Sequence, residues 1–265
     1  MRIISLLKFI YPQRLRYSIC FHFIVNRMKK YPVLFKDAPL ALAPLIKMDL
    51  KPGDFIHNWI ALLGIYEPYV TKEIKFCSKK EGLMVDVGAN FGYYTCLWCG
   101  LNPLNRAIAF EPSKKVFACL KTNIKKNQLS KRVIIEQYAL GNKGGLHSFS
   151  YESTEQTGWG RIAKNSANGN TLIKMTKLDD YCKTHSIKNI DILKIDTQGY
   201  DYFVLKGAQK MLKTKQIRKV FFEEDAECNK EFNLKPDASY KLMESLGYKI
   251  KKLDKWNYLA ELSEI

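Results

Sequence analysis

Residues 84–95 read MVDVGANFGYYT, and this stretch decides how the chain folds. Met84 to Val87 are typical of a strand, the next residues form a turn with Gly88 and Gly92, and a helix follows. Small residues let backbone amides approach a ligand closely, and Asn90 is one of the few non-glycine residues that tolerates a positive φ. A phosphate-binding P-loop would end in Gly-Lys-Ser/Thr, which is missing here. The stretch therefore predicts a nucleotide or nucleoside loop at the carboxyl end of a first strand.

A second strand, Ala107 to Phe110, ends in Glu111 and is followed by Pro112. An acidic residue about twenty positions after a glycine turn is placed to accept hydrogen bonds from both hydroxyls of an adenosine ribose. Each feature alone is weak, but their spacing within one β-α-β unit strengthens both. Together they predict a nucleoside-binding unit.

The remaining sequence alternates short apolar runs with helix-length stretches. A helix begins near Asp54, and further helices are expected over 114–127 and 202–213. The predicted strands are 84–87, 107–110, 133–138, 190–195 and 220–222, with a terminal hairpin over 248–252 and 256–260. This alternation predicts a Rossmann-like α/β fold, with a mostly parallel sheet flanked by helices and a C-terminal antiparallel hairpin. Residues 54–265 are the predicted catalytic domain.

Residues 1–53 form a predicted basic, amphipathic, helical extension. Residues 1–36 carry basic side chains and no acidic one, interleaved with apolar residues, and no apolar run approaches the length of a membrane-spanning helix. One interpretation is a surface helix that contacts an anionic membrane through residues 1–36. The other is a helix that caps the catalytic domain.

Composition limits the partners and the compartment. The 43 Lys and Arg against 26 Asp and Glu give a net charge of +17, which favours anionic partners. The basic residues are spread along the whole chain, so nucleic acid is a less favoured partner. The 7 cysteines are irregularly spaced and no secretory signal is evident, which predicts a cytoplasmic protein, peripheral at a membrane if the first interpretation holds. No two histidines lie at metal-ligand spacing, and the one Cys-x-x-Cys pair, Cys96 and Cys99, lacks the second pair or the histidines that a structural zinc site needs. No metal is therefore predicted, although Asp196 and Glu223 could hold a divalent ion.

Asp86 separates two candidate cofactors. In an NAD site its carboxylate would face a pyrophosphate, a repulsive arrangement, whereas the Asp-x-Gly-x-Asn-x-Gly pattern resembles methyltransferase motif I, in which the acid lies near the cationic amino end of S-adenosylmethionine. The predicted cofactor-binding residues are Asp86, Gly88, Ala89, Asn90, Gly92, Thr95, Glu111, Pro112 and Ala139.

Three ordered motifs resemble those of the FkbM-type methyltransferases over about residues 54–224. They are VDVGANFGYYT at 85–95, AFEP at 109–112, and DILKIDTQGYD at 191–201, which is continued by VLKGA at 204–208. The family usually has Glu where this chain has Gln198, and usually Glu where it has Asp201. The resemblance implies O-methylation, commonly of hydroxyls on glycans, glycolipids or secondary metabolites.

The predicted catalytic residues are Asp196, Lys194 and Glu223. Methyl transfer from a sulfonium is an in-line displacement that chiefly requires alignment, and a base helps an alcohol acceptor. Asp196 ends a strand at the ligand-binding edge and is the first candidate for the base, with contact to the methionine amino group as the alternative. Lys194, two positions earlier, could stabilise its charge, and Glu223 ends the next strand; a purely structural ion pair is the alternative for both.

Two other functions stay open from the sequence. The charge and the Lys-Asp pair are compatible with an RNA ribose 2′-O-methyltransferase, although no RNA-binding motif is evident. The replacement of the usual Glu by Gln198 is compatible with a non-catalytic nucleoside-binding protein. Aromatic residues near Asn58 and Tyr66, together with Trp159, are candidates to line an acceptor pocket.

Overall fold

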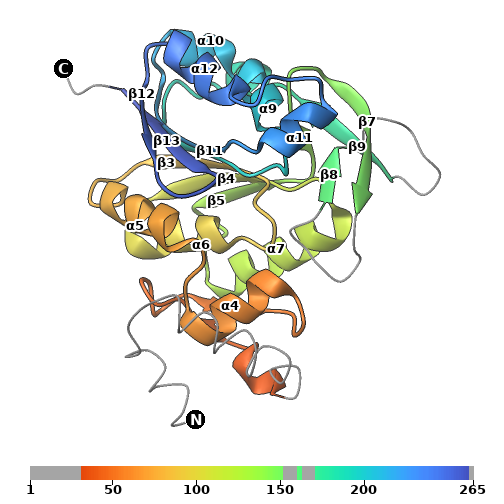
Figure 1. Cartoon of the computed structure of the whole chain (residues 1–265). Coiled ribbons are helices and arrows are strands. Elements are labelled where there is room, and N and C mark those ends of the chain that lie inside the picture. The colour runs from red at the N-terminus through yellow and green to blue at the C-terminus, as the bar shows by residue number, and fades with distance from the viewer. Residues whose placement is uncertain (1–30, 152–159, 163–170, 263–265) are drawn as a thin grey trace.

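The computed structural model describes residues 31–151, 160–162 and 171–262 (Figure 1). Most of the predicted N-terminal membrane or capping helix, residues 1–30, lies outside the described residues, and so does Trp159.

A seven-stranded sheet of order β12-β13-β11-β10-β3-β4-β5 forms the centre of the described chain. Its strands are β3 (Leu83–Val87), β4 (Arg106–Phe110), β5 (Val133–Glu136), β10 (Ile190–Ile195), β11 (Ile217–Glu223), β12 (Lys249–Lys252) and β13 (Asn257–Glu261). Strands β5, β4, β3, β10 and β11 are parallel, whereas β13 runs antiparallel to both β11 and β12. The predicted α/β fold and its terminal hairpin are confirmed.

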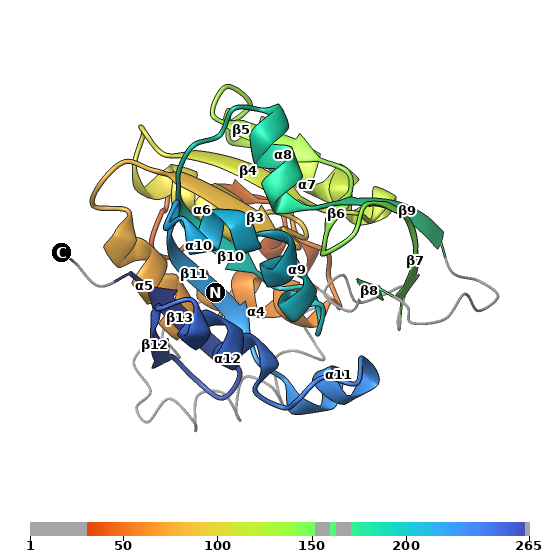
Figure 2. The ribbon, with the colours of Figure 1, turned by 90° about the horizontal axis from the view of Figure 1, so that it is seen from above.

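Helices cover both faces of this sheet (Figures 1 and 2). One face carries α4 (Phe55–Leu63), α5 (Pro68–Cys77), α6 (Tyr93–Leu101) and α7 (Lys114–Lys126), and the other carries α8 (Leu178–Thr184), α9 (Asp201–Gly207), α10 (Gln209–Lys213) and α12 (Ala238–Ser245). Alternate side chains of β3 enter the two cores, with Met84 on the α6 side and Val85 and Val87 on the α9 side. This double burial explains why the parallel strands are nearly continuous apolar runs.

Two predicted elements differ from the expectation. The helix expected over 202–213 forms as two helices, α9 and α10, divided at Ala208. Gly207, beside the division, packs on the backbone of Gly141, where a Cβ atom would lie 2.0 Å from the carbonyl oxygen. The strand expected over 133–138 stops at Glu136, and β6 (Ala139–Leu140) joins a different sheet.

That second sheet was not predicted and has the order β6-β9-β7-β8. Its other strands are β7 (Gly145–Tyr151), β8 (Gly160–Ile162) and β9 (Thr171–Thr176). Phe149, Ile173 and Met175 pack with Tyr200 into a small core of their own. Figure 1 shows this second sheet beside α11 (Ala226–Glu231). The second sheet lies next to the carboxyl edge of the central sheet.

The described part of the predicted 1–53 extension packs on the α6 and α7 side of the domain. It contains a 3-10 turn, η2 (Pro32–Leu34), and the short strands β1 (Ala38–Pro39) and β2 (Lys47–Met48). Met48 is fully buried in the same core as α6, and the Asn123 amide oxygen on α7 accepts a hydrogen bond from the Asp49 backbone at 2.8 Å. No helix among the described residues is both long enough and apolar enough to span a bilayer.

We expect Met48→Ala to lower the free energy of unfolding by about 2–5 kcal/mol, because it leaves a cavity in a shared core. The matched control is Leu45→Ala, whose side chain is 92% exposed and whose loss should change stability by less than about 0.5 kcal/mol. Urea unfolding measures both. Equal, small effects would show that the Met48 side chain adds nothing to the stability of the domain.

Candidate active site

The candidate site lies at the carboxyl ends of β3 and β10, which are neighbours in the sheet. The chain proceeds from β3 outward to β4 and β5 and then returns to β10 on the other side of β3, so the strand order reverses here. Loops diverge at such a point and leave a crevice where α/β proteins bind ligands. A pocket at this position is lined by five residues of the predicted cofactor set, Gly88, Asn90, Glu111, Pro112 and Ala139. Asp196 lines the same pocket.

The loop after β3 is in direct contact with the end of β10. The Asp196 backbone N–H donates to the Val87 carbonyl at 3.0 Å. Gly88 has a φ of 78°, and a Cβ atom at this position would lie 1.9 Å from the Asp196 carbonyl oxygen. A glycine is therefore required at 88, both by its conformation and by its neighbour. This contact fixes the position of Asp196 relative to the glycine turn.

Glu111 follows β4 and lines the pocket. Its side chain is buried and accepts hydrogen bonds from the backbone N–H groups of Asn90 at 3.0 Å and Ser113 at 2.9 Å. Burial raises the pKa of Glu111 to about 7, against the opposing effect of these two hydrogen bonds. Asn90 has a φ of 52°, as its place in the turn predicted. Its Oδ1 is the one buried side-chain polar atom in the described residues that lacks a hydrogen-bond partner.

The other four predicted cofactor residues, Asp86, Ala89, Gly92 and Thr95, are buried beside the pocket and are not among its lining residues in the described chain. Asp86 accepts a hydrogen bond from the Thr95 hydroxyl at 2.6 Å, which ties β3 to the first turn of α6. Burial raises the pKa of Asp86, and the nearby charge of Lys194 opposes that rise.

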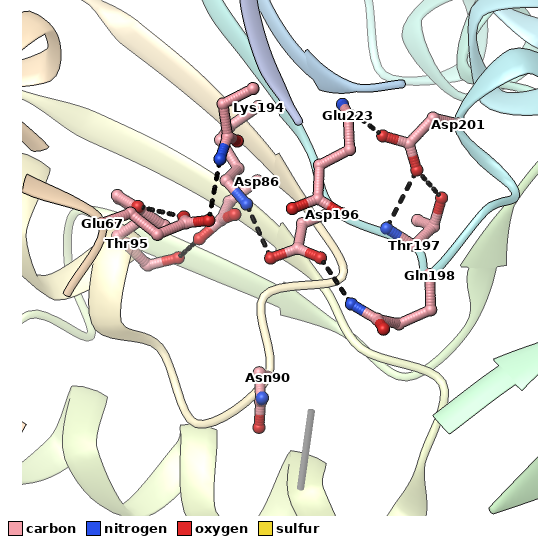
Figure 3. A network of polar contacts seen from close by, with 12 residues as sticks. Glu67, Asp86, Asn90, Thr95, Lys194, Asp196, Thr197, Gln198, Asp201 and Glu223 are labelled. Atoms are coloured by element: carbon pink, nitrogen blue, oxygen red, sulfur yellow. Dashed lines mark hydrogen bonds and ion pairs between the residues drawn. The ribbon is translucent and has the colours of Figure 1, made fainter. Parts of the chain in front are cut away.

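Lys194 and Asp196 form an ion pair, as their spacing predicted. The Lys194 Nζ lies 2.9 Å from Asp196 Oδ2, and the lysine side chain is 2% exposed against 19% for the aspartate (Figure 3). The Gln198 amide donates to the other carboxylate oxygen at 3.2 Å. Lys194 also lies over the Tyr94 ring, 4.7 Å from its centre. Burial would lower the pKa of Lys194, but the surrounding carboxylates, Asp196 foremost, raise it.

Glu67 belongs to this network and was missed by the sequence analysis. It accepts hydrogen bonds from the Tyr94 hydroxyl at 2.5 Å and from the Asn257 amide at 3.1 Å. Burial raises the pKa of Glu67, and Lys194 opposes the rise. Glu67 precedes α5, has a φ of 40° and lies outside the quoted motifs, so only tertiary packing connects it to Lys194. Its neighbour Tyr66 lines the pocket.

Glu223 ends β11 and contributes its charge to the same network. Burial, together with the charge of Asp196, raises the pKa of Glu223 well above its ordinary value. Figure 3 shows its carboxyl group beside that of Asp196.

Within the described residues no group of three or more His, Cys, Asp or Glu side chains could hold a metal ion. Asn58 is buried and its amide oxygen accepts a hydrogen bond from the Gly53 backbone at 3.2 Å.

Asp201 connects the loop after β10 to the end of β11. One of its carboxylate oxygens accepts hydrogen bonds from the Thr197 backbone N–H at 3.0 Å and from the Thr197 hydroxyl. The other accepts from the Glu223 backbone N–H at 2.9 Å. The side chain is 2% exposed, and burial raises its pKa. Asp201 thus sets the spacing between the segments that carry Asp196 and Glu223.

Residues 86–250 match the sequence model of the methyltransferase FkbM domain. The chain belongs to the FkbM methyltransferase family. The resemblance found in the three motifs is thereby confirmed.

This FkbM-family chain is also similar to one curated relative, the hexuronic acid methyltransferase AglP of Haloferax volcanii, with 26% identity over 137 residues. The match covers 52% of this chain and 54% of AglP, so the chain spans about half the length of that relative.

The chain is also similar to solved structures. The FkbM methyltransferase of Methylobacillus flagellatus has a TM-score of 0.48 at 16% identity, covering 69% of this chain and 44% of that one. The METTL16 methyltransferase domain has a TM-score of 0.50 at 14% identity, covering 96% of this chain and 97% of that one. At such identities the likeness to METTL16 shows the fold alone.

We expect Asp201→Asn to lower the free energy of unfolding by about 1–3 kcal/mol, because an amide group would face a buried N–H donor and leave it unsatisfied. Asp225→Asn is the matched control. Asp225 caps α11 by accepting from the Glu227 and Cys228 backbone, and Asn replaces Asp at such caps with little loss. Chemical denaturation compares the two variants. Equal stabilities would show that the Asp201 contacts do not hold the two strand ends together.

Proposed function

We propose that this chain transfers a methyl group from S-adenosylmethionine to a hydroxyl of a sugar, glycan or glycolipid. The observation that carries the proposal is a single pocket lined by both Glu111, a buried carboxylate at the nucleoside position, and Asp196, an ion-paired carboxylate at the strand-order reversal. The family of the chain supports methyl transfer. The relative AglP, a hexuronic acid methyltransferase, supports a sugar acceptor.

The residues of the pocket fit S-adenosylmethionine. Glu111 uses one hydrogen bond on each carboxylate oxygen for the backbone, which leaves further lone pairs for the two ribose hydroxyls. The Asn90 amide oxygen is buried without a partner and needs a donor, which a hydroxyl or ammonium group of the cofactor would supply. Gly88 leaves the loop without a side chain at the centre of the site. When bound, the cofactor supplies an electrophilic methyl group on a sulfonium.

Asp196 is the proposed general base. When the acceptor oxygen takes the methyl group that the bound cofactor would supply, its hydroxyl proton passes to a carboxylate oxygen of Asp196. Lys194 and Gln198 each hold one of those oxygens, so the carboxylate keeps one orientation. Tyr66 and Tyr200 form apolar walls of the pocket, against which a sugar ring can pack. Most of the catalysis then comes from alignment of the acceptor oxygen with the methyl carbon.

We expect cofactor affinity to depend on Glu111 and on pH. Glu111→Ala should weaken binding by about 1.5–3 kcal/mol, because two hydroxyls lose a charged acceptor. The pKa of Glu111 is about 7 without ligand, and the ionised form accepts best, so wild-type affinity should fall as the pH drops below about 7, approaching tenfold per unit.

Isothermal titration with S-adenosylhomocysteine measures this dependence. Glu111→Gln serves as the control, because it cannot titrate and any remaining pH dependence belongs to the ligand. Identical pH profiles for wild type and Glu111→Gln, with equal affinities, would reject the ribose assignment.

Asp196→Asn should reduce saturated turnover by about 10²–10⁴-fold while cofactor affinity changes little, because the amide keeps the shape but cannot take a proton. Asp191→Asn, at the opposite end of the same strand, is the matched control and should keep near-normal turnover. Formation of S-adenosylhomocysteine with pooled glycans and with RNA measures turnover. A raised dissociation constant, with turnover restored at saturation, would instead show that Asp196 binds the methionine amino group.

A further inference from the structure

Arg161 is the one Lys, Arg or His side chain among the described residues that line the pocket. It lies on β8, the short strand of the second sheet, and pairs across to Ser150 on β7. The two acidic residues that line the pocket already have partners. Glu111 accepts hydrogen bonds from the backbone of Asn90 and Ser113. Asp196 is held by Lys194 and Gln198. The cation therefore belongs to neither the predicted ribose contact nor the proposed base.

Arg161 lies on the Asp196 side of the pocket. Its guanidinium contacts both carboxylate oxygens of Glu231 on α11, at 3.0 and 3.1 Å. Cys228, on the same helix, packs against the turn after Asp196, since a Cβ atom on Gly199 would lie 2.4 Å from the Cys228 Cβ. Burial raises the pKa of the Cys228 thiol, and the charge of Arg161 opposes that rise. The guanidinium is thus near the acceptor end, whereas Glu111 follows β4, which lies two strands from β10 in the central sheet.

The Arg161–Glu231 ion pair is open to exchange. The two side chains are 30% and 49% exposed, and ion pairs at such exposure add little to stability. A carboxylate or phosphate on a ligand can accept charge-assisted hydrogen bonds from the guanidinium, as Glu231 does. A carboxylate can also bind the guanidinium in a planar, bidentate geometry. Such an anion also needs a cation here, because the Asp196 carboxylate lines the same pocket and would repel it.

We propose that Arg161 binds an anionic group of the acceptor, a carboxylate or a phosphate carried by the sugar, in exchange for Glu231. This inference rests on the proposed methylation of a sugar hydroxyl and names the class of sugar. The hydroxyl to be methylated lies at Asp196 and the anionic group lies at Arg161, so the ion pair fixes which part of the ring faces the base.

Three acceptors of one sugar test the proposal: the uronic acid glycoside, its neutral parent and the corresponding sugar phosphate. Initial rates of S-adenosylhomocysteine formation give KM and kcat for each. The wild-type protein should show a KM at least about tenfold lower for one or both anionic sugars than for the neutral one. The comparison of uronate with phosphate identifies the anion.

Two variants separate recognition from a structural role. Arg161→Gln should raise KM for the anionic sugar about 10–100-fold and abolish the preference for it, with cofactor affinity unchanged. Glu231→Gln should lower that KM severalfold, because it removes the competing carboxylate, whereas loss of a purely structural ion pair would act alike in both variants. Arg218→Gln is the control. Arg218 forms an ion pair of 3.3 Å with Asp191, and neither residue lines the pocket.

The outcomes distinguish this inference from the proposed function. Equal KM values for neutral and anionic sugars, or parallel losses in Arg161→Gln and Glu231→Gln on all sugars, would overturn the role of Arg161 while leaving sugar methylation intact. If no sugar is methylated at all, the proposed function fails. Calorimetric titration of the uronic acid and the sugar phosphate into wild type and Arg161→Gln, with S-adenosylhomocysteine present, then decides the anion site alone, and equal or absent binding rejects it.

Discussion

The buried ammonium of Lys194 is the constraint on which the arrangement of the site depends. A charge that is 2% exposed must be compensated by neighbouring charges, and the compensating carboxylates come from segments far apart in the chain. Asp86 lies on β3, Glu67 precedes α5, and Glu223 ends β11. Asp196 directly follows β10, the strand that carries Lys194. Removal of the lysine would leave these buried and partly buried carboxyl groups without a counter-charge. The same interaction that holds these segments together therefore also orients the proposed base.

A second constraint is steric and acts at the same strand end. The absence of a side chain at Gly88 lets the loop after β3 lie directly on the Asp196 backbone, which brings the glycine turn and the proposed base into one pocket. The two departures from the usual family pattern, Gln198 and Asp201, are compatible with this arrangement. Gln198 donates to Asp196 where a second carboxylate would repel it, and Asp201 reaches the backbone of both flanking segments. Gln198 and Asp201 therefore both help to hold the segments around Asp196 in place.

The sequence alone determined the sheet and the order of its motifs. The strands ending in Asp86-Val87, Glu111 and Asp196 were predictable because parallel strands are buried on both faces and stand out as apolar runs, and because the strand ends of one sheet share an edge. The pairing of Lys194 with Asp196 followed from their two-residue spacing on one strand. These features depend on local periodicity or on short separations in the chain.

Only the tertiary structure placed Glu67, the second sheet and Arg161. Glu67 carries no local signal, because its partners Tyr94 and Asn257 are 27 and 190 positions away. The second sheet consists of short strands that are joined by loops. Its exposed positions include apolar residues such as Leu146 and Leu172, so the sequence lacks the clear alternation of apolar and polar residues that predicts a strand. Arg161 is one basic residue among 43 Lys and Arg in the sequence, and only folding brings it to the pocket. A local pattern specifies a strand or a turn, whereas the charges around a site are set by which distant segments pack together.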